Sequence, residues 1–232
     1  VPLAELEVGV PESIRQVIEK QIERVDPEQQ RLLEVAAVAG LEFSTSAAAA
    51  GLEQTLMHVE EQCEQLARRQ LFLRATGVSI YPGGTVTARY AFIHALYQEV
   101  LYQRVAAGRR ACLHQLIGGR GEELYGEYGN EVAAELAMHF EQGHDYRRAV
   151  KYLRQAAQNH LLRYANREAI AYLGRALDLV KQWPENERAD AHMAILEQAG
   201  LARRAMGDMG GAAANFDALA EYAGELGRKE DE

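Results

Sequence analysis

Apolar side chains recur every three or four positions through residues 11–69, which is the spacing that lines one face of a helix. Capping residues divide this region, because Asp26 with Pro27 suits the start of a helix and Gly40 suits an end. The pattern therefore predicts four helices. Their starts are Pro11, Glu28, Ser44 or Ser46, and about Thr55, and the last helix ends at Arg69.

After this last helix, the helical spacing of apolar residues gives way to an alternation of apolar and polar residues. Leu71–Thr76 and Thr85–Ile93 are rich in branched and aromatic residues, and the turn sequence Tyr81–Gly84 lies between them. We expect a two-stranded β-hairpin, with His94 at the point where the second strand gives way to a further helix. Three or four short helices followed by such a hairpin have the order of a winged helix.

From about residue 107 the pattern is helical throughout and combines large with small apolar residues. These residues share the faces of successive predicted helices: Leu136, Ala137 and Phe140; Ala149, Leu153 and Ala156; Ala169, Leu173 and Ala176; and Gly200, Ala212 and Phe216. Tetratricopeptide repeats follow this scheme, although the spacing here is irregular. We also expect the glycines of Ile117–Leu124 to loosen a helix.

These patterns predict a mainly α fold with two domains. Residues 11–106 are interpreted as a winged-helix domain with a β-hairpin wing, and residues 107–232 as an irregular tetratricopeptide-like α-solenoid. Residues 1–10 show no clear period and are interpreted as a linker.

Composition and charge limit the classes of function that the chain can have. The 232 residues are 48% hydrophobic, and their formal charge of −9 argues against a nucleic-acid or anionic-membrane surface. Cys63 falls on an apolar stripe, and the two cysteines form no disulfide or zinc pattern, so we expect a reducing, cytoplasmic compartment. The chain begins with Val1 rather than Met, and we expect it to be a fragment of a longer protein.

The helix before the hairpin is where a winged helix would read DNA. Here that helix carries Glu60, Glu61 and Glu64, and residues 1–100 hold 8 Lys+Arg against 14 Asp+Glu. Such a surface repels phosphates. A DNA-binding regulator that uses Arg68, Arg69 and Arg74 is therefore kept as a less favoured alternative.

Four segments, Val10–Phe43, Thr87–Val105, Arg109–Ile117 and Ala133–Ala157, together resemble the region that follows the nucleotide-binding module of bacterial STAND-class signal-transduction ATPases. The most specific part is FIHALYQEVLY, residues 92–102. The resemblance implies a winged-helix lid, joined to a helical-repeat arm that senses a protein or ligand. It also implies a neighbouring ATPase module as a partner, with ATP or ADP bound there and no cofactor in this fragment.

In that class, a histidine at the end of the wing contacts the β-phosphate of ADP and holds the closed state. His94 occupies the matching place, within Ile93-His94-Ala95 where relatives carry Met-His-Asp. The histidine matches and the acidic partner does not. The alternative is that His94 only caps its helix or packs beneath the hairpin. An exposed position would keep the phosphate contact open, and full burial would exclude it.

The sequence carries no phosphate-binding G-x-x-x-x-G-K-[ST] motif and no metal-ligand spacing. Because no nucleophile–base or paired-carboxylate constellation stands out either, we expect no enzyme activity. Arg104, Arg109 and Arg110 are interpreted as a solvated basic face. Three functions stay open: a regulatory region of an ATPase, a DNA-binding regulator, or a plain protein-interaction scaffold.

Overall fold

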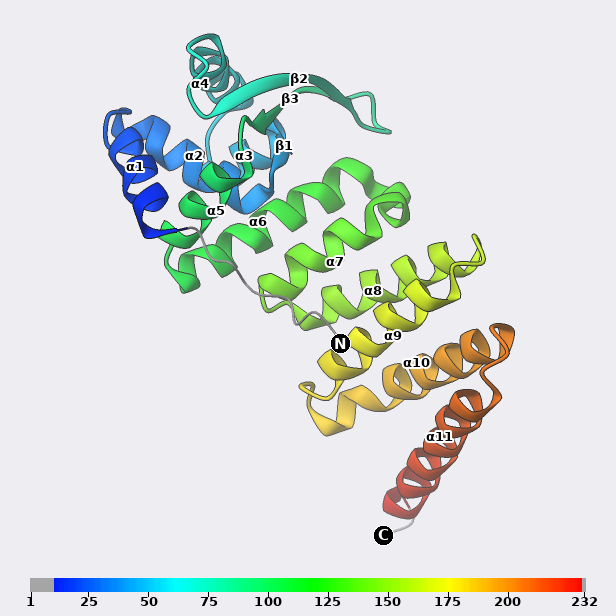
Figure 1. Cartoon of the computed structure of the whole chain (residues 1–232). Coiled ribbons are helices and arrows are strands. Elements are labelled where there is room, and N and C mark those ends of the chain that lie inside the picture. Colours follow the sequence, from blue (N-terminus) through cyan, green and yellow to red (C-terminus); the bar gives the residue numbers. More distant parts are fainter. Residues whose placement is uncertain (1–10, 231–232) are drawn as a thin grey trace. The chain divides into compact units, whose positions relative to one another are not determined.

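The computed structural model describes residues 11–230, with side chains up to residue 225, and it is mainly helical with one small antiparallel sheet (Figure 1). The prediction of a mainly α fold is confirmed. The chain divides into two compact units between Tyr125 and Gly126. The expected linker, residues 1–10, lies outside the described residues. Among the described helices, none is long and apolar enough to span a membrane.

Four helices open the first unit: α1 (Glu12–Ile22), α2 (Pro27–Ala39), α3 (Thr45–Leu52) and α4 (Leu56–Arg68). Capping fixes their starts, because the Asp26 carboxylate accepts hydrogen bonds from the backbone N–H groups of Glu28 and Gln29. The Ser44 hydroxyl accepts one from Ala47, so Ser44 rather than Ser46 caps α3. The predicted helix starts are thus confirmed to within about a residue.

The sheet holds three antiparallel strands in the order β1–β3–β2: β1 (Glu42–Ser44), β2 (Leu73–Ile80) and β3 (Val86–Phe92). The predicted hairpin is confirmed, and the Tyr81 N–H donates to the Thr85 carbonyl across its turn (2.9 Å). The third strand, β1, was not predicted, and it pairs with β3. Three residues are too few to show alternation. The Phe43 ring anchors β1 against Tyr90 and Phe92.

The first unit ends with α5 (Ala95–Arg104) and α6 (Ala107–Tyr125). Helix α6 runs through Ile117–Leu124 without a break, so the predicted loosening there is wrong. The reason is burial, since Leu113 and Ile117 pack against Val35 and Val38 of α2. Because α6 packs on α2 and α3, the division between units falls after Tyr125 and not at the expected boundary after residue 106.

The second unit consists of helices of which each contacts the next (Figure 1). They are η1 (Gly126–Val132), α7 (Ala133–Gln142), α8 (Tyr146–Leu161), α9 (Asn166–Val180), α10 (Glu185–Ala205) and α11 (Met209–Glu230). Leu136, Phe140 and Leu153 are buried as their spacing predicted. Gly200 of α10 lies against the Phe216 ring of α11. Small residues thus let neighbouring helices approach closely.

Candidate functional site around His94

His94 lies at the junction between β3 and α5, and the ends of the strands hold that junction. The Phe92 N–H donates to the Leu41 carbonyl (2.9 Å), and the Ile93 N–H donates to the Phe72 carbonyl (2.8 Å). His94 itself is extended, with φ −147° and ψ 137°, and it is the N-cap of α5. Its side chain is exposed. The structure therefore keeps the phosphate contact open, as an exposed position was expected to do.

The ring of His94 has one nitrogen engaged and one available. Its Nδ1 accepts a hydrogen bond from the Leu96 N–H (3.1 Å), so the proton of the neutral ring is on Nε2. The Tyr97 ring stands edge-on to the imidazole, with centroids 6.5 Å apart. The histidine is thus a helix cap whose outer nitrogen is a hydrogen-bond donor, and the two sequence interpretations of His94 are compatible.

A cavity of about 200 Å³ lies beside the imidazole between α1 and α5. Its lining is mostly apolar and comprises Ile14, Val17, Ile18, Gln21, His94, Leu96 and Tyr97. Ile14 and Val17 are 40% and 57% exposed, whereas Ile18 and Ile22 on the same predicted stripe are buried. The outer half of the α1 stripe is therefore an apolar surface next to His94.

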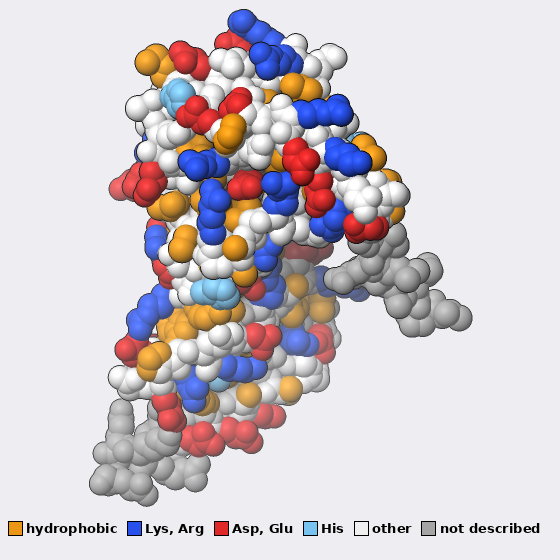
Figure 2. Space-filling model, turned by 90° about the vertical axis from the view of Figure 1, so that its left-hand side faces the viewer, with side chains coloured by type: hydrophobic (Ala, Val, Ile, Leu, Met, Phe, Trp, Pro, Cys, Tyr) orange, Lys and Arg blue, Asp and Glu red, His pale blue; other side chains and the backbone are white. Residues whose placement is uncertain are grey.

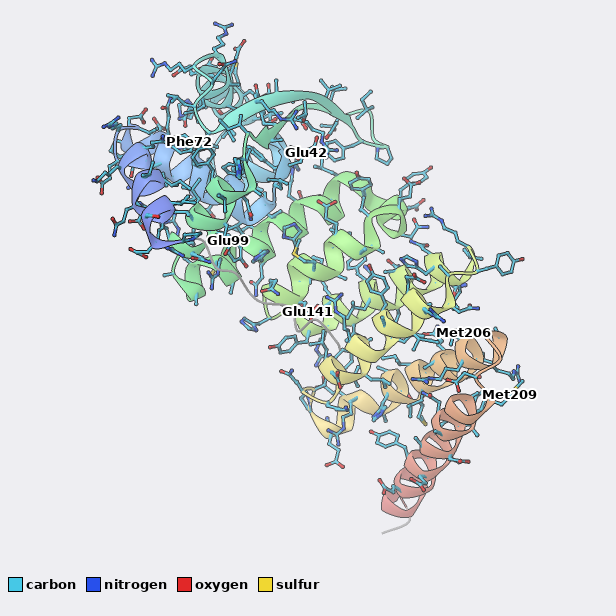
Figure 3. The ribbon with its side chains drawn as sticks, viewed as in Figure 1. Glu42, Phe72, Glu99, Glu141, Met206 and Met209 are labelled. Carbon is cyan, nitrogen blue, oxygen red and sulfur yellow. The ribbon has the colours of Figure 1, made fainter. Side chains whose placement is uncertain are left out.

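A second cavity of about 280 Å³ adjoins the first and shares Gln21 and Tyr97 with it. The Tyr97 hydroxyl donates to Gln21 Oε1 (3.1 Å), and the Tyr97 ring meets Phe72 edge-on at 4.9 Å (Figure 3 labels Phe72). Arg24 also lines this cavity. Both cavities are smaller than the roughly 300 Å³ at which pockets enclose drug-sized ligands. Each cavity is therefore large enough to contact only part of a drug-sized ligand.

The sequence pointed to His94 but not to Gln21 or Arg24. These residues reach the site because α1 packs on α5, some 75 residues later in the chain. No local pattern signals that approach. Figure 2 shows the face of the molecule that lies on the left in Figure 1, where apolar side chains lie among charges of both signs.

The surface of α4 does not favour nucleic acid. Glu61 and Glu64 are exposed, and Glu64 pairs with Arg68 (2.6 Å). Glu60 turns inward, where its carboxylate accepts hydrogen bonds from the Thr45 hydroxyl (3.0 Å) and from the Ala88 N–H (3.1 Å). Glu60 therefore ties α4 to α3 and to the sheet.

The predicted basic face on α5 and α6 is partly neutralised. Arg104 and Arg109 pair with Glu34 at 3.9 and 3.2 Å, and Arg110 lies over the Tyr102 ring at 4.6 Å. These contacts give the three arginines structural partners within the first unit.

Two ionisable side chains, His114 and Cys63, are buried in the first unit, and the sequence patterns predicted this only for Cys63. Burial, with a smaller effect of Arg110, lowers the pKa of His114 to about 4, and the Tyr102 hydroxyl lies 3.3 Å from its Nε2. Burial also raises the pKa of the Cys63 thiol to about 12, so Cys63 is a thiol and not a nucleophilic thiolate at neutral pH. The prediction that Cys63 is a core residue is confirmed.

Among the described residues, no group of three or more His, Cys, Asp or Glu side chains is placed to hold a metal ion. In comparisons with family models, curated proteins and solved structures, nothing matches this chain.

Proposed function

We propose that this chain is a non-catalytic regulatory region of a cytoplasmic STAND-class ATPase, in which a winged-helix lid is joined to a tetratricopeptide-like arm. The order α2–β1–α3–α4–β2–β3, with strand order β1–β3–β2, supports the winged-helix assignment of the first unit. The paired faces of large and small residues in α7–α10 support the repeat assignment of the second.

One observation carries the lid role: His94 is exposed and is anchored through Nδ1, which leaves its Nε2–H as a donor beside a cavity lined mostly by apolar residues. In the proposed closed state, Nε2–H donates to one phosphate oxygen of ADP held by the neighbouring module. Ile14 and Val17 would cover the contact and lower its exposure to water, which strengthens a hydrogen bond to an anion.

A ligand that binds the arm would shift the equilibrium between the closed and open states of the lid. A protein or peptide that binds the arm better when the lid is open shifts the balance towards the open state, by no more than its difference in affinity for the two states. In this proposal the lid and the arm need no chemistry of their own.

The test separates the capping role of His94 from its phosphate contact. In the longer protein that the proposal implies, His94→Asn keeps a side-chain acceptor for the Leu96 N–H but replaces the imidazole Nε2–H by the amide of a shorter side chain, whereas His94→Ala removes both the acceptor and the donor. Because a hydrogen bond to a charged group contributes about 1.5–3 kcal/mol, ADP affinity measured by calorimetry is expected to fall at least tenfold in both variants. His144→Asn, at an exposed histidine of the second unit, is the control.

Wild-type ADP affinity in His94→Asn would overturn the lid role and leave His94 as a helix cap. In that case the chain would be an interaction scaffold. The thermal midpoint of each variant shows whether it still folds, so a loss of affinity caused by unfolding is recognised directly.

A further inference from the structure

A cavity of about 660 Å³ lies between the carboxyl end of α4 and the sheet, and the His94 side chain is not part of its lining. It is lined by Glu64, Ala67, Arg68, Gln70, Leu73, Arg74, Ala75, Tyr90 and Ile93. Its volume falls in the range of roughly 300–1,000 Å³ that is usual for small-molecule sites. The lid and arm functions proposed above do not involve this cavity.

The lining separates into an apolar floor and a charged rim. The apolar side chains of the lining that reach the surface are Ala67, Ala75 and Ile93, because Leu73 and Tyr90 are buried in the core of the first unit. At the rim, Arg68 is neutralised by Glu64 (2.6 Å). Arg74 is exposed, and within the described residues no carboxylate pairs with it. The rim therefore carries one uncompensated positive charge.

The wall that connects the helix to the sheet is held in a strained conformation. Gln70 and Phe72 both have positive φ, at 52° and 64°, which costs a non-glycine residue about 1 kcal/mol or more. Hydrogen bonds from the Gln70 N–H to Ala67 (3.0 Å) and from the Leu71 N–H to Leu66 (2.9 Å) hold the segment in place. The wall is thus preorganised, with Gln70 facing the cavity.

We propose that this cavity binds a monocarboxylate with an apolar body, the carboxylate at Arg74 and Gln70 and the body against Ala67, Ala75 and Ile93. One net positive charge matches a monoanion, and Glu64 disfavours a dianion or a phosphate backbone. The same chemistry is offered by a small organic acid and by a glutamate-bearing apolar peptide. This inference is independent of the proposed lid function.

The experiment is an NMR titration of this chain with matched probes. We expect 4-phenylbutyrate or acetyl-Leu-Glu-Phe-amide to shift the amide resonances of Leu73, Arg74, Ala75 and Tyr90. The neutral counterparts, 4-phenylbutyramide and acetyl-Leu-Gln-Phe-amide, should bind at least tenfold more weakly. Whichever acid binds more tightly identifies the source of the carboxylate.

Arg74→Gln is expected to weaken the acid about tenfold and leave the weak binding of the amide unchanged. Arg69→Gln, an exposed arginine nearby that does not line the cavity, should have no effect. Both positions are exposed, and a dispersed spectrum confirms folding. The proposal is overturned if neither acid shifts these resonances, if acid and amide bind equally, or if Arg74→Gln binds like the wild type.

Discussion

At the scale of the single residue, the buried His114 makes the stability of this protein depend on pH. His114 is 3% exposed, and burial together with Arg110 lowers its pKa to about 4. In the unfolded chain a histidine titrates near its ordinary pKa of about 6.5. Between these values the unfolded state binds more protons than the folded state, so the free energy of unfolding falls as the pH is lowered.

From this difference we expect the wild type to lose about 2 kcal/mol of unfolding free energy between about pH 7 and pH 5 through His114 alone. Urea denaturation at the two pH values measures it. His114→Gln removes the titrating group and should show a correspondingly smaller pH dependence, even though its absolute stability is lower. Equal losses in the wild type and the variant would contradict the assignment.

At the scale of elements, packing between helices depends on glycines that leave no room for a side chain. A Cβ at Gly200 would lie 2.8 Å from two carbons of the Phe216 ring, and the ring belongs to the next helix. At Gly174 of α9, by contrast, a Cβ would meet nothing within 4 Å. The two positions therefore form a natural pair for comparing helix propensity with steric overlap.

We expect Gly200→Ala to destabilise the second unit by about 1–3 kcal/mol, because overpacking outweighs the gain in helix propensity. Gly174→Ala should stabilise it by up to about 1 kcal/mol. Chemical denaturation monitored by circular dichroism distinguishes these outcomes. Two stabilised variants would mean that α11 can move away from α10 without cost.

Local signals predicted these elements well wherever one residue type decides the geometry. Asp26 and Ser44 fixed helix starts, and the residues of Tyr81–Gly84 fixed a turn. Prediction failed where a distant partner decides the outcome. Strand β1 exists because Phe43 packs on residues of β3, and α6 stays whole because Leu113 is buried against α2. The same holds for the candidate site. The sequence places His94 at the junction between a strand and a helix, whereas no sequence pattern indicates that Gln21 belongs to the same site.

At the scale of the whole molecule, the chain folds into two units with separate cores. One buried cluster contains Ile22, Leu66 and Leu101 and lies in the first unit, and another contains Phe140, Leu173 and Ile195 and lies in the second. None of the described core clusters draws buried residues from both sides of Tyr125. We therefore expect the two units to open by separate equilibria.

Hydrogen exchange followed by mass spectrometry can test this separation in the full chain. Gly51→Ala should raise exchange only in the first unit, because its Cβ would lie 2.6 Å from Val35 Cγ1. Gly200→Ala should raise exchange only in the second. Faster exchange throughout the chain in either variant would show a single cooperative unit instead.

The inward carboxylate of Glu60 also constrains how this protein can change over generations. Replacing Glu60 by lysine would remove the acceptor for Thr45 and Ala88 together. A descendant that acquired DNA binding would first have to alter Glu61 and Glu64, whose side chains face solvent. The acidity of this helix is therefore inherited in part as a requirement of the fold.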